Sequence, residues 1–350
     1  MSEKSENEEI KIEEERYGIS CKSLLDDLFG RRYTDYYTWM IKEIDHIGGL
    51  LTLGRMVIIG GQHGSGKTTF ITELAKNNAK TKPTMLIPLE MGMDFTVMML
   101  ACNMFNNQRG KEVAVLGYGE VEEGYLYKRP EEDRKLFKAC VEELYKDYPY
   151  LYINNPKTNS FEDLVEMIRD YYGRFGIKFF IIDHLHQLDS SQEKDGETAF
   201  YSKVAKELKI LAETLGIALL CIVQLTKLAN GGKGELDLSA FKGTSDFSGS
   251  SHRAAMIKKP SFIPLKDAEC KRFIVNNANT GILDDLGIDD RDNLEKVRAF
   301  YEEQFKKDTR HIREILFLKT RGRDGGTATI QMKKGEFKFL QFGSYVYKRF

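Results

Sequence analysis

Several features are scarce in this 350-residue sequence, and each scarcity excludes a class of protein. The cysteines are few, odd in number and scattered: Cys21, Cys102, Cys140, Cys221 and Cys270. Because no two of them form a Cys-x-x-Cys pair, we expect reduced core thiols and no disulfide or zinc framework. No apolar run approaches the length of a membrane span, so we expect no membrane segment and a cytoplasmic location.

The sequence also lacks an excess of charge of either sign. The 52 Lys and Arg residues nearly balance the 53 Asp and Glu residues, leaving a formal net charge of −1. A chain-wide basic surface for nucleic acid is therefore excluded, and any contact with DNA must be local or shared between subunits.

The hydrophobic content of 41% and aromatic content of 11% allow a sizeable core and exclude wholesale disorder. Residues 1–16 are rich in Glu and Lys, so we expect a frayed tail there, with short helices between Ser20 and Glu43 and a turn over 44–51. Trp39 is the only tryptophan and is expected either to be a buried anchor or to pack against a neighbouring subunit.

One glycine-rich stretch carries a specific chemical signal. Residues 61–69 read Gly-Gln-His-Gly-Ser-Gly-Lys-Thr-Thr and fit the phosphate-loop pattern G-x-x-x-x-G-K-[ST] between an apolar run and a helical segment. Glycines let backbone N–H groups converge on phosphate oxygens, and the following helix presents its positive end. We expect nucleoside triphosphate binding by Gly61, Gln62, His63, Gly64, Ser65, Gly66, Lys67, Thr68 and Thr69, with Lys67 on the phosphates and Thr68 on Mg²⁺.

Apolar strand-like runs alternate with helical segments through the first two thirds of the chain. Strands are expected at 56–61, 84–89, 150–154, 178–183 and 217–223. Helices are expected at 67–78, 94–106, 130–147, 162–172 and 200–214, with irregular chain over 109–122. This alternation predicts an α/β fold with a doubly wound, mostly parallel sheet and helices on both faces.

The last third is different. A polar insertion at about 260–313 contains one expected helix, from Asn293 to about Phe305, and the runs 314–318, 327–332 and 336–340 predict C-terminal antiparallel strands. We therefore predict an extension or linker over 1–44 and one ATPase domain over 45–350.

Polar residues at strand ends supply a second layer of chemistry. Asp183 is expected to hold the Mg²⁺ shell, although a strand-terminal Asp can also merely cap a turn. Glu90 could polarise the attacking water, and Gln224 could hydrogen-bond the γ-phosphate. Lys319 and Arg321 follow another apolar run and suit an arginine-finger role.

In this order the motifs resemble those of the DnaB-type hexameric replicative helicases, including the mitochondrial Twinkle type, which have a RecA-like motor fold. Leu89-Glu-Met91 resembles the family's S-L-E-M segment, Ile181 to Leu188 its I-D-Y-L-Q-L stretch, Gln224-Leu225 its S-Q-L, and Lys319-Thr-Arg321 its K-x-R. The resemblance extends from about residue 45 to 342.

The resemblance implies an ATP-dependent DNA helicase that uses ATP and Mg²⁺ at subunit interfaces of a hexameric ring. It implies Glu90 as the catalytic base and Asp183 as the Mg²⁺ acid, with Lys319 and Arg321 supplied by the adjacent subunit. Single-stranded DNA would be contacted by Lys242, Gly243 and Thr244, although a solvated loop is the alternative for these residues. A primase or a loader is the implied further partner.

The sequence also departs from the family. Ser248 to Ala254 replaces an acidic segment, and no counterpart of the N-terminal helical domain or of a primase domain is recognised. His184 and His186 could bind metal, or they could be neutral histidines that face the channel or are partly buried. A RecA-fold ATPase without unwinding activity, such as a recombination mediator or replication regulator, therefore remains the second hypothesis. A non-catalytic nucleotide-dependent scaffold is a third.

Overall fold

The computed structural model describes residues 36–109, 116–191, 195–226, 237–241, 245–259, 267, 270, 294–309, 312–320, 326–333 and 336–340. The chain divides into two compact units, Met1–Tyr37 and Thr38–Phe350. Of the first unit only the short strand β1 (Tyr36–Tyr37) is described. The second unit contains the residues of every motif discussed above.

Within the described residues, one nine-stranded sheet organises the second unit, in the order β11-β10-β9-β8-β3-β7-β6-β4-β5. Its strands are β3 (Arg55–Gly61), β4 (Thr84–Pro88), β5 (Leu151–Ile153), β6 (Phe179–Asp183), β7 (Ala218–Ile222), β8 (Arg253–Lys258), β9 (Ile312–Thr320), β10 (Gly326–Lys333) and β11 (Glu336–Leu340). Neighbours from β8 to β5 pair in parallel, whereas β9, β10 and β11 add antiparallel strands at one edge. A short strand β2 (Leu51–Thr52) precedes β3.

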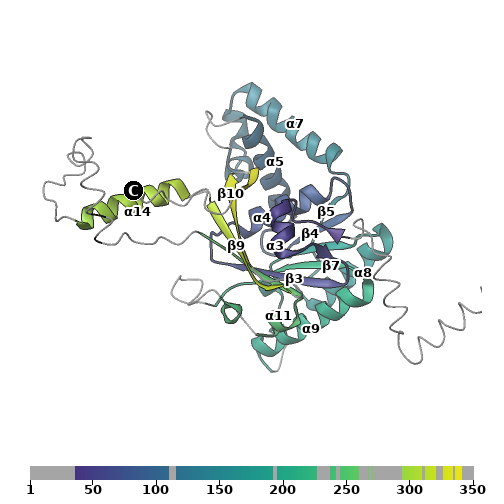
Figure 1. Cartoon of the computed structure of the whole chain (residues 1–350). Coiled ribbons are helices and arrows are strands. Elements are labelled where there is room, and N and C mark those ends of the chain that lie inside the picture. The colour runs from purple at the N-terminus through teal and green to yellow at the C-terminus, as the bar shows by residue number, and fades with distance from the viewer. Residues whose placement is uncertain are drawn as a thin grey trace, which may run out of the picture. The chain divides into compact units, whose positions relative to one another are not determined.

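Helices cover both faces of this sheet (Figure 1). Helices α4 (Lys67–Asn78), α5 (Met93–Arg109) and α7 (Glu131–Asp147) lie on one side. Helices α8 (Phe161–Phe175), α9 (Glu197–Leu215) and α11 (Ser245–Ser250) lie on the other. The shorter helices are α3 (Lys42–Gly48), α6 (Tyr118–Glu122), η2 (Tyr125–Lys128), η3 (Leu185–Gln187) and η4 (Leu238–Ala240), and α14 spans Leu294–Thr309. The predicted doubly wound α/β fold with C-terminal antiparallel strands is confirmed.

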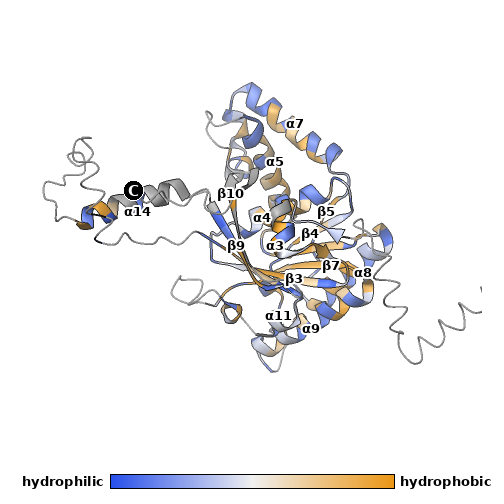
Figure 2. Ribbon diagram, in the orientation of Figure 1, coloured by the Kyte–Doolittle hydropathy of each residue, from blue (hydrophilic) through white to orange (hydrophobic). Residues whose placement is uncertain are grey.

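The core follows from the apolar runs of the central strands, which are buried on both faces. Met56 and Ile58 of β3 pack with Phe180 of β6 and Cys221 of β7 against α8 and α9. Figure 2 shows the hydrophobic residues concentrated on β3 and β7. Because every described residue of β4, β6 and β7 is buried, these strands lack polar alternation, as is typical of a parallel sheet covered on both sides.

Helix boundaries follow local capping. The Ser160 side chain accepts a hydrogen bond of 3.1 Å from the Asp163 N–H at the start of α8, as the capping-box pattern predicts. Gly176 ends that helix at φ +65°, a conformation that favours glycine.

Three elements of the structure differ from the sequence predictions or are absent from them. In place of the turn expected over 44–51, helix α3 begins at Lys42 because buried Trp39 orders the segment. The Trp39 N–H bonds the Asp45 carboxylate (2.7 Å), and its ring Nε1–H bonds the Gly49 carbonyl (2.8 Å).

Strand β8 is not predicted because its central alanines carry little strand propensity, although the strand is buried between β3 and β9. Helix α6 lies in a region expected to be irregular.

Expected helices over 20–43 fall largely outside the described residues, as does most of the polar insertion at 260–313. The helix expected from Asn293 is present as α14. Within the parts of the chain that the structure describes, no helix combines the length and hydrophobicity needed to cross a membrane.

Candidate functional site

The phosphate loop connects the carboxyl end of β3 to the first turn of α4. Gly64 (φ +67°) and Gly66 (φ +88°) adopt left-handed conformations that let the chain turn tightly before Lys67. Gly61 is required for a different reason. A Cβ atom at Gly61 would lie 2.6 Å from both the Ile257 carbonyl oxygen and the Ser65 hydroxyl oxygen. The backbone at Gly61 thus lies too close to Ile257 and Ser65 for any side chain to fit.

Lys67 lies along the inside of this loop. Its Nζ donates to the Gly61 carbonyl (2.9 Å) and the Gln62 carbonyl (3.1 Å). Burial lowers the pKa of the Lys67 ammonium, and the negative charges of Asp183 and Glu90 oppose that shift. An anion placed in the loop would stabilise the same charge.

Ser65 offers a second indication that the loop is shaped for an anion. Its side chain is only 1% exposed, and its hydroxyl has no hydrogen-bond partner within the described structure. The Ser65 carbonyl accepts a hydrogen bond of 2.8 Å from the Arg313 side chain, which ties the loop to β9. A buried hydroxyl without a partner is costly, so a bound oxygen ligand would satisfy it.

Asp183 closes the base of the site. The Thr68 hydroxyl donates to the Asp183 carboxylate at 2.7 Å, joining the first turn of α4 to the end of β6. Burial raises the pKa of Asp183 to about 6, helped by Glu90 and opposed by the Thr68 hydrogen bond and Lys67. A hydroxyl and a carboxylate in contact are hard oxygen ligands, and a cation bound there would offset the cost of burying the carboxylate.

Glu90 follows the neighbouring strand. Its N–H donates to the Asp183 carbonyl (3.1 Å), and its side chain is 44% exposed to the cavity and solvent. The Glu90 carboxylate lies 3.4 Å from Nε2 of His184. Glu90 is therefore anchored through its backbone while its carboxylate can still reach a water molecule.

Gln224 lies just after β7, which pairs with β6 on the side away from β4. Its side-chain nitrogen is 3.1 Å from His184 Nε2, and its N–H donates to His186 Nδ1 at 3.2 Å. The His186 ring packs against the Tyr201 ring at a centroid distance of 4.5 Å and an interplanar angle of 41°. The two histidines thus position Gln224, and no metal-binding cluster of three or more His, Cys, Asp or Glu residues occurs among the described residues.

Five of these residues, Lys67, Thr68, Glu90, His184 and Gln224, line one cavity of about 410 Å³. It is lined by Gly61, His63, Gly64, Gly66, Lys67, Thr68, Thr69, Glu90, Met91, Met99, His184, Gln224 and Leu225. The predicted site residues from four segments of the sequence are therefore brought together at the carboxyl ends of adjacent parallel strands, where α/β sheets bind ligands.

Lys319 lies apart from this cavity. Its Nζ donates to the carbonyl oxygens of Ser248, Gly249 (3.1 Å) and Ser251 (2.7 Å), around the carboxyl end of α11. Arg321 and the predicted DNA loop residues Lys242, Gly243 and Thr244 lie outside the described residues.

Sequence reasoning missed one residue that contacts the site and left the role of another open. Arg313 comes just before the strand predicted at 314–318 and belongs to no motif. Only the tertiary structure therefore reveals its hydrogen bond to the phosphate loop. His184, expected to be a metal ligand or a neutral buried residue, lies between Glu90 and Gln224. The unusual His-x-His spacing was the available signal.

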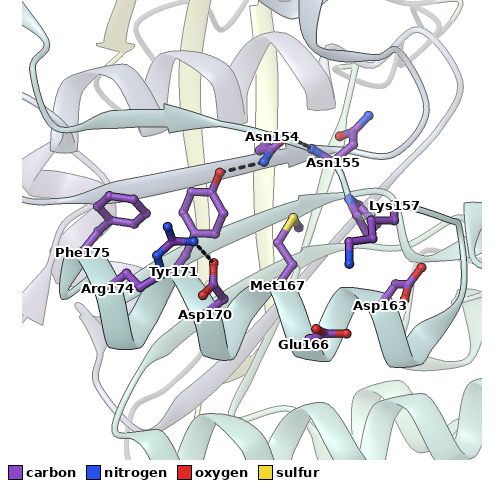
Figure 3. A pocket seen from close by; sticks show the side chains of 11 residues that line it. Asn154, Asn155, Lys157, Asp163, Glu166, Met167, Asp170, Tyr171, Arg174 and Phe175 are labelled. Atoms are coloured by element: carbon purple, nitrogen blue, oxygen red, sulfur yellow. Dashed lines mark hydrogen bonds and ion pairs between the residues drawn. The ribbon is translucent and has the colours of Figure 1, made fainter.

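A larger cavity of about 540 Å³ lies between α8 and the residues that follow β5 (Figure 3). Its polar groups pair with one another: the Asn154 amide bonds the Tyr171 hydroxyl (2.6 Å), and Arg174 pairs with Asp170 (3.0 Å). It contains none of the motif residues, so size alone does not identify the functional site.

Comparisons with known proteins agree with this geometry. Residues 39–239 match the family model for the DnaB-like helicase C-terminal domain, which is more than half of the chain. The chain belongs to this family. Domains of the DnaB-like helicase family use a nucleotide, which agrees with the phosphate loop found at the carboxyl end of β3.

Curated relatives are distant. A probable plasmid replicative DNA helicase of Chlamydia psittaci is 23% identical over 197 residues, covering 56% of this chain and 40% of that protein. The replicative DNA helicase DnaB of Leifsonia xyli subsp. xyli is 25% identical over 187 residues, covering 53% and 38%. The chain thus spans about two fifths of the length of these relatives.

Solved structures support the same fold. One solved ATPase domain aligns with a TM-score of 0.63 and 15% identity, covering 91% of this chain and 96% of that one. A DnaB-like replicative helicase, studied with its interactions with primase, aligns with a TM-score of 0.65 and 15% identity, covering 94% and 70%.

Proposed function

We propose that this DnaB-like domain is the ATP-hydrolysing motor of a ring-shaped helicase that moves along single-stranded DNA and unwinds duplex DNA in replication. The observation that carries the proposal is the 2.7 Å bond between Thr68 and Asp183, with Lys67 and Glu90 facing the same cavity. Family membership supplies the context in which this arrangement hydrolyses ATP.

The residues present fit ATP and Mg²⁺. The buried Ser65 hydroxyl and the Lys67 ammonium would bind phosphate oxygens, and Thr68 and Asp183 would hold the Mg²⁺ shell. When bound, Mg²⁺ neutralises charge that develops on the phosphates. Gln62, His63 and Thr69 would complete the loop around the nucleotide.

Two further side chains would carry the chemistry. Glu90, which is partly exposed, would accept a proton from the water that attacks the γ-phosphate. Gln224 would hydrogen-bond the γ-phosphate and respond to its loss. Their position in the lining of one cavity, together with Lys67 and Thr68, supports these roles.

We propose that the site is completed by a neighbouring copy. Arg321 would reach the γ-phosphate of the adjacent subunit, with Lys319 beside it after leaving the α11 carbonyls that it contacts in its own chain. Six copies would also present six sets of Lys242, Gly243 and Thr244 to one DNA strand. Such sharing explains how a chain of net charge −1 could hold DNA.

A primase is a candidate partner. A structural neighbour is a DnaB-like replicative helicase studied with its interactions with primase. A loader is a second candidate partner, which the resemblance to replicative helicases implies.

A RecA-fold ATPase without unwinding activity is the second candidate function. It is favoured by the segment Ser248–Ala254, which lacks the acids found at this place in the family pattern and instead offers main-chain carbonyls to Lys319. Coupling between the DNA loop and the ATP site would then differ from that in the family.

Measurement of ATP hydrolysis with and without single-stranded DNA, together with displacement of one strand from forked DNA, tests the proposal. We expect DNA-stimulated hydrolysis and ATP-dependent displacement, both abolished by Lys67→Ala. Hydrolysis without displacement would favour the second candidate. A chain that binds ATP but has neither activity would be a nucleotide-dependent scaffold.

A further inference from the structure

Arg313 lies near the start of β9, on the face of the sheet that carries α4. Alternate residues of a strand share a face, so Arg313 lies on the same side as Phe317. The Phe317 ring packs against Trp39 at a centroid distance of 5.6 Å, and Trp39 packs against Phe70 of α4 at 6.2 Å. The Arg313 side chain therefore extends on the side of the helix that follows the phosphate loop.

Strand pairing sets the position of Arg313 along the sheet. In β8, Ile257 pairs both with Gly61, the first residue of the phosphate loop, and with Ile315 of β9. Because β9 is antiparallel to β3, Arg313 lies beyond Ile315 in the direction in which β3 enters the loop. Arg313 is half-buried and is not part of the cavity lining, and its Nε donates to the Ser65 carbonyl at 2.8 Å. It thus contacts the loop from behind.

Two other loop carbonyls are bound from the cavity side. The Lys67 ammonium donates to the Gly61 carbonyl (2.9 Å) and to the Gln62 carbonyl (3.1 Å). The Gln62 carbonyl also accepts from the Ser65 N–H at 3.0 Å, within the loop. The Ser65 carbonyl differs from these, because its donor comes from a strand more than 240 residues later in the chain.

The direction of the Ser65 carbonyl fixes the direction of the next N–H group. The bond between Ser65 and Gly66 is trans, and in a trans peptide unit the carbonyl and the N–H point in opposite directions. With its carbonyl turned to Arg313, this peptide unit turns the Gly66 N–H toward the cavity that Gly66 lines. Gly66 is the amino-terminal cap of α4, where N–H groups have no partner within the helix. An anion in the cavity can therefore accept from it.

Glycine at position 66 makes an external anchor necessary. Gly66 has a φ of +88°, and glycine adopts positive and negative φ values about equally well. The Ser65–Gly66 peptide unit could therefore rotate to the opposite orientation at little cost in backbone strain. Its N–H would then point toward β9, and its carbonyl would face the phosphates.

We propose that Arg313 is a positioning residue that holds the Ser65–Gly66 peptide unit with its N–H directed at the phosphates. This inference rests on the proposed function, because it takes the β-phosphate of a bound nucleotide as the acceptor. Arg313 itself does not line the cavity. It orders the loop before the nucleotide binds, which lowers the cost of ordering it on binding. ADP and ATP share the β-phosphate, so binding of both depends on Arg313.

NMR on the full chain tests the orientation of this peptide unit. The sequence contains two Ser-Gly pairs, Ser65-Gly66 and Ser248-Gly249, so labelling the carbonyl carbon of serine and the nitrogen of glycine selects two amide signals. Replacing Ser248 by Ala removes one signal and assigns the other. Mg-ADP should move the Gly66 signal strongly downfield, because its N–H comes to donate to a charged oxygen. Arg313→Met at saturating Mg-ADP should lose most of that shift.

Two results of this experiment would overturn the proposal. One is an unchanged Gly66 shift in Arg313→Met with Mg-ADP bound. The other is the absence of any shift in the wild-type chain with Mg-ADP bound, a measurement that does not depend on how well the variant folds.

Two substitutions of similar shape separate the hydrogen bond from the charge. Arg313→Gln keeps an N–H donor as far along the side chain as the arginine Nε, whereas Arg313→Met has a methyl group there. We expect Arg313→Met to weaken binding of Mg-ADP and of a non-hydrolysable Mg-ATP analogue about tenfold each, as loss of a hydrogen bond to a charged group does. Arg313→Gln should retain most of the affinity.

Hydrolysis should respond differently from binding. In both variants kcat at saturating ATP should change less than about threefold, since the β-phosphate contact is made in the ground state and the transition state alike. Equal losses of affinity in Arg313→Gln and Arg313→Met would show that the charge matters and not the hydrogen bond, and would overturn the proposal.

Arg253→Met is the matched control. Arg253 is also a half-buried strand arginine that donates to a main-chain carbonyl, that of Leu50, but it pairs with Thr320 at the far end of β9. Affinity for Mg-ADP and the Gly66 shift should stay as in the wild-type chain. The same losses in Arg253→Met would indicate a general effect on stability and would contradict the specific role of Arg313.

The outcomes also separate this inference from the proposed function. A wild-type chain that does not bind Mg-ADP would refute both. Binding with the same Gly66 shift in the wild-type chain and in Arg313→Met would refute only the role of Arg313. A chain that binds Mg-ADP and shows the Arg313-dependent shift but does not hydrolyse ATP would refute only the motor activity.

Discussion

At the scale of single residues, Gly61 limits what the phosphate loop can tolerate. We expect Gly61→Ala to destabilise the fold by about 2 kcal/mol and to abolish nucleotide binding, because its Cβ would lie 2.6 Å from the Ile257 backbone oxygen. Denaturant unfolding and titration with a fluorescent ATP analogue measure the two effects. Gly173→Ala is the control, since nothing lies within 4 Å of a Cβ there and a helical alanine should stabilise α8. Equal effects of the two substitutions would contradict the steric argument.

Asp45 provides a pH-dependent prediction. Burial raises the pKa of its carboxyl to about 6, against the opposing hydrogen bond from the Trp39 N–H. The folded chain then binds a proton more tightly than the unfolded chain, so stability falls as pH rises from about 4 to about 6 and stays lower above that.

Replacing Asp45 by Asn keeps an oxygen that can accept from the Trp39 N–H and removes the charge. We expect Asp45→Asn to raise the melting temperature by roughly 1–3 °C at pH 7.5 and to leave it unchanged at pH 4. Thermal scans at both pH values check this. A gain of the same size at pH 4 would show that the charge is not the cause.

At the scale of elements, Lys319 of β9 fixes the carboxyl end of α11. Its ammonium contacts three carbonyl oxygens at the end of the helix and in the following turn. The last carbonyl groups of a helix have no N–H partner within the helix, so the lysine supplies a donor for them. We expect Lys319→Met to destabilise the chain by about 1–2 kcal/mol, as loss of a partly buried cation at a helix carboxyl end does. Urea unfolding measures the change.

Lys258→Met is the control for that loss, because Lys258 makes one ion pair with Glu314 of β9 (2.9 Å) between partly buried side chains. It should cost less than Lys319→Met. If the two variants are equally stable, the carbonyl contacts contribute no more than an ordinary ion pair.

Elements differed in how well they could be predicted. The strands from β3 to β7 are recognisable because each is a short apolar run, and three of them lead to a polar residue with a proposed chemical role: Glu90, Asp183 or Gln224. Strand β8 is not, since Arg253–Lys258 is identified as a strand by its pairing with β3 and β9 and not by its own residues. Helix α3 likewise depends on the tertiary anchor Trp39.

At the scale of the whole molecule, the proposed ring makes each ATP site depend on two copies. We expect Arg321→Ala to abolish hydrolysis and leave ATP binding intact, and Lys67→Ala to abolish binding. Mixing the two inactive variants should restore part of the activity, because some interfaces then combine an intact loop with an intact finger. Activity of each mixture is compared with that of each variant alone, and lack of any recovery would argue against a finger supplied in trans.

The sequence by itself determined the chemistry of the loop from Gly61 to Thr69, the order along the chain of the strands of the nine-stranded sheet other than β8, and the residue types at their ends, because these follow from local spacing and hydrophobic runs. Only the tertiary structure decided which of these residues meet. The parallel pairing of β4, β6 and β7 beside β3 places Glu90 and Gln224 around one cavity and brings Asp183 to the Thr68 hydroxyl beside it. It also places His184 beside both Glu90 and Gln224, and it brings the Lys319 ammonium to the carbonyl oxygens at the end of α11. Such contacts join residues far apart in the chain, so no local pattern encodes them.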